Sequence, residues 1–247
     1  MKHCDPHGGN ILIRPRFSIW SKIPVLAYVL GSHNFELVLL DHGLYRTLND
    51  TFRLEYAHLW DAIIRSDEPQ IEEYSYRLFT HNERVTKGGV DHHRLFASML
   101  TGRSWEVISS GGVATKRTDE EMGMISSKVS QGRFIVAIAD ILAKLPTELL
   151  MVLKTNDLLR AVDEALGVGK TSQEHMVRMV STMGWYCAWA IWDRSAQSYS
   201  TFRWFRPAYY ADFLHFMKAE VRLWGLRAAI GFQEWKKWLL PTKSVMP

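Results

Sequence analysis

Two short polar segments near the start of the chain carry residue types and spacings that suit phosphoryl transfer. The first, from His3 to Asn10, fits H-x-D-x-x-x-x-N, and the second, at Asp41, fits D-x-G at the end of an apolar stretch. In this chemistry a carboxylate and an amide hold the Mg²⁺ that neutralises the phosphates of ATP, and another carboxylate orients the attacking oxygen. We therefore predict that Asp5 is the catalytic carboxylate and that Asn10 and Asp41 are the magnesium ligands.

The sequences of these two segments resemble the motifs of one family. His-Cys-Asp-Pro-His-Gly-Gly-Asn at 3–10 and Leu-Asp-His-Gly-Leu-Tyr-Arg at 40–46 resemble the UbiB/ADCK atypical kinases, also called aarF-domain kinases, of the mitochondrial branch. The likeness continues in three further stretches, 56–60, 95–105 and 149–160. It implies ATP and Mg²⁺ as cofactors, with Asp5 at the catalytic-loop position and Asn10 and Asp41 at the metal positions. It also implies phosphotransferase or ATPase activity linked to lipid or ubiquinone homeostasis, and a mitochondrial location.

The parts of that family that grip ATP from above are expected before the catalytic loop. A lysine-bearing strand, an alanine-rich nucleotide loop and a K-x-G-Q segment are not present ahead of Asp5 in these residues. Because phosphoryl transfer depends on positioning the nucleotide between two lobes, we expect little activity from this chain alone, as from a fragment or a truncated gene product. The alternatives are a non-catalytic, pseudokinase-like interaction module, or a chain whose site is completed by another polypeptide.

Composition and periodicity predict a mainly α (α+β) chain. The 247 residues are 47% hydrophobic and 23% charged, which is typical of a globular domain, and the net charge of +4 permits anionic partners. The resemblance implies the C-terminal lobe of a kinase-like fold over residues 1–167, with a helical extension over 168–247. Two cysteines make no disulfide framework. The basic residues follow no nucleic-acid-binding motif, so nucleic acid is not an expected partner.

A pass along the chain predicts where the elements lie. Apolar runs at 10–13 and 35–40 predict a short β-hairpin, joined by an unusually apolar insert over 17–34. Helices are predicted in turn from three- and four-residue spacings, capping boxes and prolines, with Gly102–Gly112 as a loop. Their expected ranges are 52–64, 71–78, 91–100, 118–145, 146–166, 172–193 and 207–239.

Two further motifs suggest other chemistry. Histidines at 3, 7, 92 and 93, with Cys4 nearby, invite a zinc interpretation, but no H-E-x-x-H or paired C-x-x-C spacing supports it. Gly167–Thr171 imitates a P-loop but carries glutamate where the first glycine belongs. We interpret this segment as the end of one helix and the start of the next.

The C-terminal tail is the second informative region. Seven of the ten tryptophans follow residue 184, and from Arg194 onward nine Lys/Arg face three Asp/Glu. On the final predicted helix one face gathers Phe213, Met217, Val221, Trp224, Ala228, Phe232 and Trp235, opposite Lys218, Arg222 and Lys236. A basic amphipathic helix of this kind can lie on an anionic membrane surface. The alternative is that the apolar face packs onto the kinase-like lobe and the charges are simply solvated.

Overall fold

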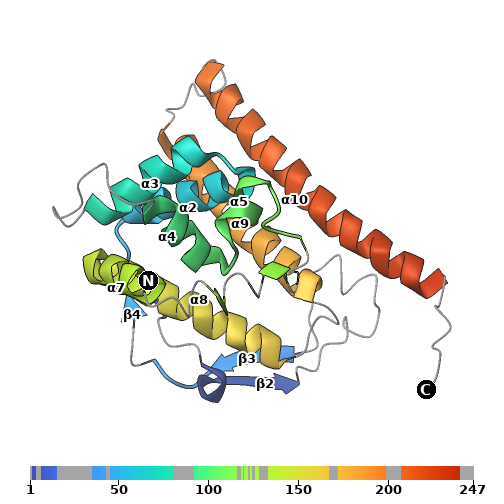
Figure 1. Cartoon of the computed structure of the whole chain (residues 1–247). Helices are drawn as coiled ribbons and strands as arrows, with labels where there is room; N and C mark the ends of the chain where they lie inside the picture. The colour runs from blue at the N-terminus through green and yellow to red at the C-terminus, as the bar shows by residue number, and fades with distance from the viewer. Residues whose placement is uncertain are drawn as a thin grey trace. The chain divides into compact units, whose positions relative to one another are not determined.

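The structure is a computed structural model. It describes residues 2–3, 7–15, 35–42, 45–80, 92–115, 118, 120–121, 123, 126–127, 133–166, 172–198 and 207–239. Helices dominate, and a short antiparallel hairpin lies near the N-terminus (Figure 1). The predicted fold class, mainly helical with an N-terminal hairpin, is confirmed.

The chain forms two compact units. The hairpin unit contains Met1–Leu48 and Thr147–Gly167, and the helical unit contains Asn49–Pro146 and Val168–Pro247. Both segments of the helical unit supply helices that pack together, since α2 from the first packs on α9 from the second. The predicted division into 1–167 and 168–247 stays a prediction.

In the hairpin unit, two strand pairs hold the N-terminal segments together. β2 (Ile11–Pro15) pairs antiparallel with β3 (Phe35–Leu39), with Ile11 opposite Leu39. β1 (Lys2–His3) pairs with β4 (Tyr45–Arg46), and α8 (Thr147–Ala165) completes the unit. The predicted hairpin is confirmed, while the insert over 17–34 lies outside the described residues.

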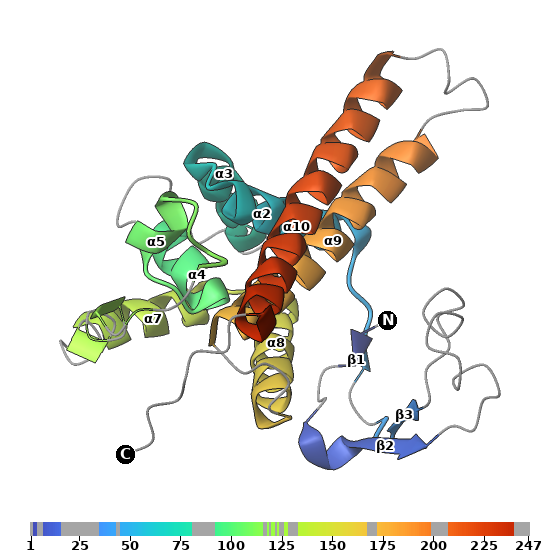
Figure 2. The ribbon, with the colours of Figure 1, turned by 90° about the vertical axis from the view of Figure 1, so that its right-hand side faces the viewer.

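The helical unit contains the remaining described helices of Figure 1. They are α2 (Asp50–Arg65), α3 (Glu68–Thr80), α4 (His92–Thr101), α5 (Trp105–Ser109), α7 (Arg133–Lys144), α9 (Ser172–Ser198) and α10 (Pro207–Leu239). The final two lie side by side (Figure 2). No helix of the described residues is long and apolar enough to cross a membrane.

α2 forms the centre of the helical unit because its apolar residues recur at three- and four-residue steps. The side chains on this stripe are buried: Phe52, Tyr56, Leu59, Trp60 and Ile63. Asn49 caps the start of α2, where its side chain accepts a hydrogen bond from Thr51 N at 3.1 Å. Ser66 ends the helix in the left-handed conformation, φ 57°.

A glycine lets three helices meet in this unit. A Cβ atom at Gly184 of α9 would lie 2.9 Å from Ile64 Cδ1 of α2 and 2.9 Å from Leu223 Cδ2 of α10. Both distances are too short for carbon atoms, so the missing side chain makes this approach possible. Close packing of this kind fixes how α2, α9 and α10 are stacked.

The prediction that Gly102–Gly112 is a loop is wrong in its middle. Trp105–Ser109 forms α5, and Ile108 is completely buried. Ser104 stands before the helix, and Gly111, with φ 79°, follows its end, so both boundary signals are present in the sequence. The helix is too short for the hydrophobic period to reveal it.

A buried ion pair connects the residues just before α5 to the segment that follows the helix. Arg103 Nε donates to Glu121 Oε1 at 2.9 Å, and the two side chains are 1% and 2% exposed. The same Oε1 accepts from Ser104 N at 3.0 Å, while Arg103 Nη1 donates to the carbonyl oxygens of Val113 and Thr115. Glu121 N donates to Thr118 Oγ1 at 3.2 Å, which is one of the two hydrogen bonds of a capping box. The Glu121 carboxylate instead accepts from the guanidinium.

Candidate active site

The strand pairing of the hairpin brings two of the three predicted site residues together. Beyond the β2–β3 ladder, Leu40 N donates to Asn10 O at 2.9 Å, which extends the pairing by one step. Asp41 follows immediately. Its Oδ2 accepts a hydrogen bond from Asn10 Nδ2 at 3.4 Å. Residues 31 positions apart in the sequence therefore share the open end of one hairpin.

A short turn before Asn10 sets the position of the Asn10 backbone. His7 Nδ1 accepts a hydrogen bond from Gly9 N at 3.2 Å, and Asn10 N donates to His7 O at 2.9 Å. Gly8–Asn10 forms one short 3₁₀ turn. A Cβ atom at Gly9 would lie 3.1 Å from His7 Cε1, so the glycine makes room for the imidazole. The Gly-Gly-Asn sequence of the motif therefore forms the turn that leads into β2.

The segment after Asp41 is anchored by a second pair of side chains. His42 Nδ1 and Tyr45 Oη lie 2.5 Å apart, and the two rings stack with centroids 5.7 Å apart. Tyr45 also stands opposite His3 in the β1–β4 ladder. The two motifs are therefore joined at two places, once between Asn10 and Asp41 and once between His3 and Tyr45.

The catalytic carboxylate predicted at Asp5 lies outside the described residues, together with Cys4 and Pro6. Its role stays a prediction. The nearest described residues on either side are His3, which belongs to β1, and His7, which precedes the 3₁₀ turn.

The donor set of Asn10 and Asp41 fits magnesium. Mg²⁺ prefers oxygen ligands and binds proteins through one or two side chains, with water and phosphate oxygens filling its other positions. A metal would take the Asn10 amide through Oδ1, so the present hydrogen bond from Nδ2 would be exchanged for coordination. Asp41 is solvent-exposed, which leaves access for a nucleotide.

Two of the histidines considered for zinc, His92 and His93, have acidic neighbours. His93 Nε2 lies 3.3 Å from Glu68 Oε1, and His92 Nε2 lies 3.8 Å from Asp140 Oδ2. Among the side chains that the structure describes, no group of three or more His, Cys, Asp or Glu could hold a metal ion. The P-loop imitation at 167–171 lies outside the described residues.

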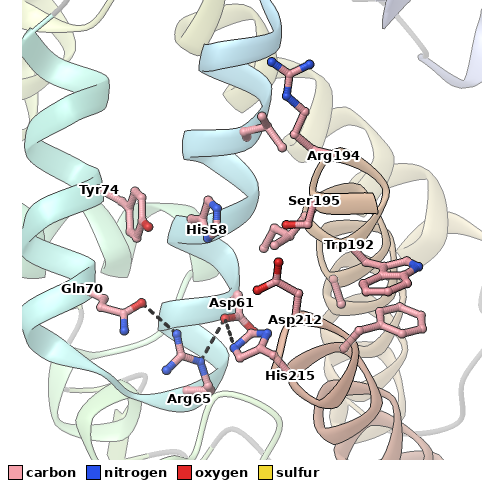
Figure 3. A pocket seen from close by; sticks show the side chains of 14 residues that line it. His58, Asp61, Arg65, Gln70, Tyr74, Trp192, Arg194, Ser195, Asp212 and His215 are labelled. Atoms are coloured by element: carbon pink, nitrogen blue, oxygen red, sulfur yellow. Dashed lines mark hydrogen bonds and ion pairs between the residues drawn. The ribbon is translucent and has the colours of Figure 1, made fainter. Parts of the chain in front are cut away.

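A second polar site lies within the helical unit, in a pocket of about 380 Å³ between α2, α3, α9 and α10 (Figure 3). Arg65 is the centre of its hydrogen-bond network. The guanidinium donates to Asp61 Oδ2 at 3.0 Å, to Asp67 Oδ2 at 3.0 Å and to Gln70 Oε1 at 2.9 Å. His215 of α10 approaches the same oxygen of Asp61 at 3.6 Å. The network links the end of α2 to α3 and α10.

His58 lines this pocket beside the network and stacks on Tyr74, with ring centroids 4.8 Å apart. Burial lowers the pKa of His58, and the nearby Asp61 carboxylate opposes that shift only in part. The imidazole is therefore disposed to stay neutral. Arg65 engages two carboxylates and an amide, so this hydrogen-bond network connects α2 to the start of α3.

Sequence reasoning missed two polar networks, the partly buried one around Arg65 and the buried pair of Arg103 and Glu121. Asp61 and Arg65 stand four residues apart on α2, a spacing that signals an ion pair. No comparable local signal connects Arg103 with Glu121, which lie 18 positions apart. Their pairing depends on tertiary structure.

Comparison with known proteins identifies the family of the chain. The ABC1 atypical kinase-like domain matches residues 1–75, a range that contains Asp5, Asn10 and Asp41. The chain is 38% identical to AarF domain-containing protein kinase 1 of Xenopus laevis over 170 residues, which make up 69% of this chain and 28% of that protein. The chain belongs to the ABC1/AarF atypical kinase family. This family, also called UbiB/ADCK, is the one that the sequence motifs resemble.

More distant relatives extend the match. The chain is 33% identical to the ABC1 family protein MCP2 of Saccharomyces cerevisiae over 196 residues, which are 79% of this chain and 31% of the yeast protein. The chain thus spans roughly three tenths of the length of these ABC1/AarF relatives. No solved structure matches it.

Proposed function

We propose that the hairpin site of this ABC1/AarF chain is the metal-holding half of an ATP- and Mg²⁺-dependent phosphotransferase or ATPase. The observation that carries the proposal is the 3.4 Å contact between Asn10 Nδ2 and Asp41 Oδ2. It joins the last residue of the H-x-D-x-x-x-x-N motif to the first residue of the D-x-G motif. In phosphoryl transfer these two positions share a metal ion, so their side chains must be neighbours.

The roles follow from the chemistry of each group. The oxygens of Asn10 and Asp41 would hold Mg²⁺, which supplies the positive charge that offsets the negative charge of the transferred phosphoryl group. Asp5 would orient the attacking oxygen of a hydroxyl or a water and accept its proton. His7 and Tyr45 would keep the two segments in register, through the Gly9 turn and the His42 contact.

The biological setting is proposed from family membership. We propose that the complete protein acts in mitochondrial lipid or ubiquinone homeostasis. This part of the proposal rests on the likeness to the ABC1/AarF proteins. We also propose that the 247 residues alone turn over ATP slowly, because effective phosphoryl transfer also requires groups that position the nucleotide from the opposite side.

The test is Mg²⁺-dependent ATP turnover by the natural gene product that contains these residues. Asp41→Asn should lower turnover at least about 100-fold, because the charged metal ligand is lost. Asp50→Asn is the matched control, since Asp50 is an exposed acid outside the hairpin that pairs with Arg53 at 3.4 Å. Equal turnover by the wild type and Asp41→Asn would remove Asp41 from the metal role.

The alternative function is a pseudokinase-like interaction module without catalysis. It would be established by the absence of Mg²⁺-dependent turnover in the natural gene product and by equal nucleotide binding in the wild type and Asp41→Asn. Family membership and the fold would be unaffected by that result.

A further inference from the structure

α10 presents two apolar faces, and α9 accounts for one of them. Tyr209, Ala219 and Leu223 are buried, and Trp192 of α9 packs against the Tyr209 ring with centroids 5.3 Å apart. Leu223 meets α9 near Gly184. This face explains why α10 lies along α9 (Figure 2).

The other apolar face of α10 is exposed. Its centre, here called the α10 stripe, consists of Leu214, Met217, Val221 and Trp224, which follow one another at three- and four-residue steps and so share a side of the helix. Val221 is 65% exposed and Trp224 is 72% exposed. Tyr210 and Phe232 extend this side in both directions and are also largely exposed. A continuous exposed apolar stripe of this kind indicates an interaction surface.

The charges beside the α10 stripe are positive. Lys218 follows Leu214 by four residues and precedes Val221 by three, so it borders the stripe, and Arg222 lies one turn beyond Lys218. Both cations are exposed. Among the described side chains of α10 the exposed ones include no aspartate or glutamate, since Asp212 and Glu220 are half-buried.

We propose that the α10 stripe binds the surface of an anionic lipid bilayer, with α10 lying in the plane of the interface. Tryptophan and aliphatic side chains would enter the boundary between headgroups and acyl chains. The Lys218 and Arg222 side chains are long enough to keep their charges among the phosphates while their methylenes cover apolar surface. The proposal does not depend on the metal site.

Charge decides against a second copy of the chain as the occupant. Helices that pair through an apolar seam usually place opposite charges along its edges. Here the exposed edge offers cations without exposed acids among the described side chains, so two copies meeting on this face would bring like charges together. An anionic bilayer complements the same edge.

The test is co-sedimentation of the full 247-residue chain with phosphatidylcholine vesicles that contain or lack phosphatidylglycerol. The wild type should bind the anionic vesicles. The double variant Val221→Gln/Trp224→Gln should bind them at least about tenfold more weakly, because two large apolar groups no longer enter the interface. Val136→Gln on α7 is the matched control, since Val136 is 69% exposed, and it should bind like the wild type.

A charge series separates lipid binding from general stickiness. Lys218→Gln and Arg222→Gln should each weaken binding to anionic vesicles about fivefold. The exposed cation Arg178 on α9 provides the control Arg178→Gln, which should leave binding unchanged. Circular dichroism checks that every variant is folded.

Three results would overturn the proposal. The first is a folded wild type that does not bind anionic vesicles, and the second is equal binding by the wild type and Val221→Gln/Trp224→Gln. The third is a wild-type dimer in the absence of lipid that the same double variant converts to monomer, which would assign the α10 stripe to a second copy.

Discussion

The Arg103–Glu121 pair provides a sharp test of how the helical unit is held together. Glu121→Ala removes the carboxylate that faces a guanidinium only 1% exposed, at a distance of 2.9 Å. Arg103 would keep its bonds to the Val113 and Thr115 carbonyl oxygens at 3.2 and 2.7 Å, but its buried charge would have lost the carboxylate. Breaking a buried pair from one side costs about 3–5 kcal/mol of unfolding free energy.

The cost of losing the negative charge of Glu121 can be separated from the cost of losing a hydrogen bond. Glu121→Gln keeps an oxygen that can accept from Arg103 Nε and Ser104 N, so it should cost less, about 1–2 kcal/mol. Arg103→Met/Glu121→Leu should cost less than the sum of its single variants, because the two side chains interact directly. Both outcomes follow from the charge pairing.

The assay is urea denaturation of the 247-residue chain, followed by tryptophan fluorescence and circular dichroism. Glu120→Ala is the matched control, because Glu120 is the exposed neighbour of Glu121 and should change stability by no more than about 0.5 kcal/mol. Glu121→Ala and Glu120→Ala with the same unfolding free energy would refute the argument that the pair stabilises this region.

Two further predictions concern the helical packing. Because burial lowers the pKa of His58, the unfolded chain takes up a proton near pH 6.5 that the folded chain resists, so His58 should make stability fall as pH drops below about 6.5. His58→Phe, which can keep the stack on Tyr74, should lose less stability between pH 7.5 and 5.5 in urea titrations; an unchanged drop would contradict this role. Gly184→Val should cost about 1–3 kcal/mol, because even a Cβ atom would lie 2.9 Å from Ile64 and Leu223. If Gly184→Val had the same melting temperature as the wild type, α2 and α10 would make room for the added side chain at no cost in stability, which would contradict this prediction.

Much of the fold follows from local patterns. The stripe of α2, the two apolar runs of the hairpin, and Pro207 at the start of α10 each specify an element without reference to the rest of the chain. The face that sequence periodicity gathers on α10 is the exposed one at Val221 and Trp224. Local pattern does not say which apolar face of a helix will be covered, because that depends on the neighbour.

The candidate site likewise combines contacts that local patterns predict with contacts that depend on tertiary structure. The proximity of Asn10 and Asp41 is predictable, since motif spacing and hairpin pairing both lead to it. The His42–Tyr45 contact and the Asp61–Arg65–Gln70 network are harder to foresee, because they depend on side-chain directions within turns and between helices. α5 was missed because five residues make too little of a helical period.

The central claim, that Asn10 and Asp41 share one divalent cation, is tested most directly by magnetic resonance. Mn²⁺ substitutes for Mg²⁺ on oxygen ligands and broadens the signals of nearby nuclei. In the natural gene product carrying labelled asparagine, Mn²⁺ with ATP should broaden the Asn10 side-chain amide, while Mg²⁺ with ATP, which is diamagnetic, should leave it sharp. Asp41→Asn should abolish the selective broadening at Asn10. An Asn10 amide that stays sharp in the wild type, or broadens equally in Asp41→Asn, would contradict the shared metal site.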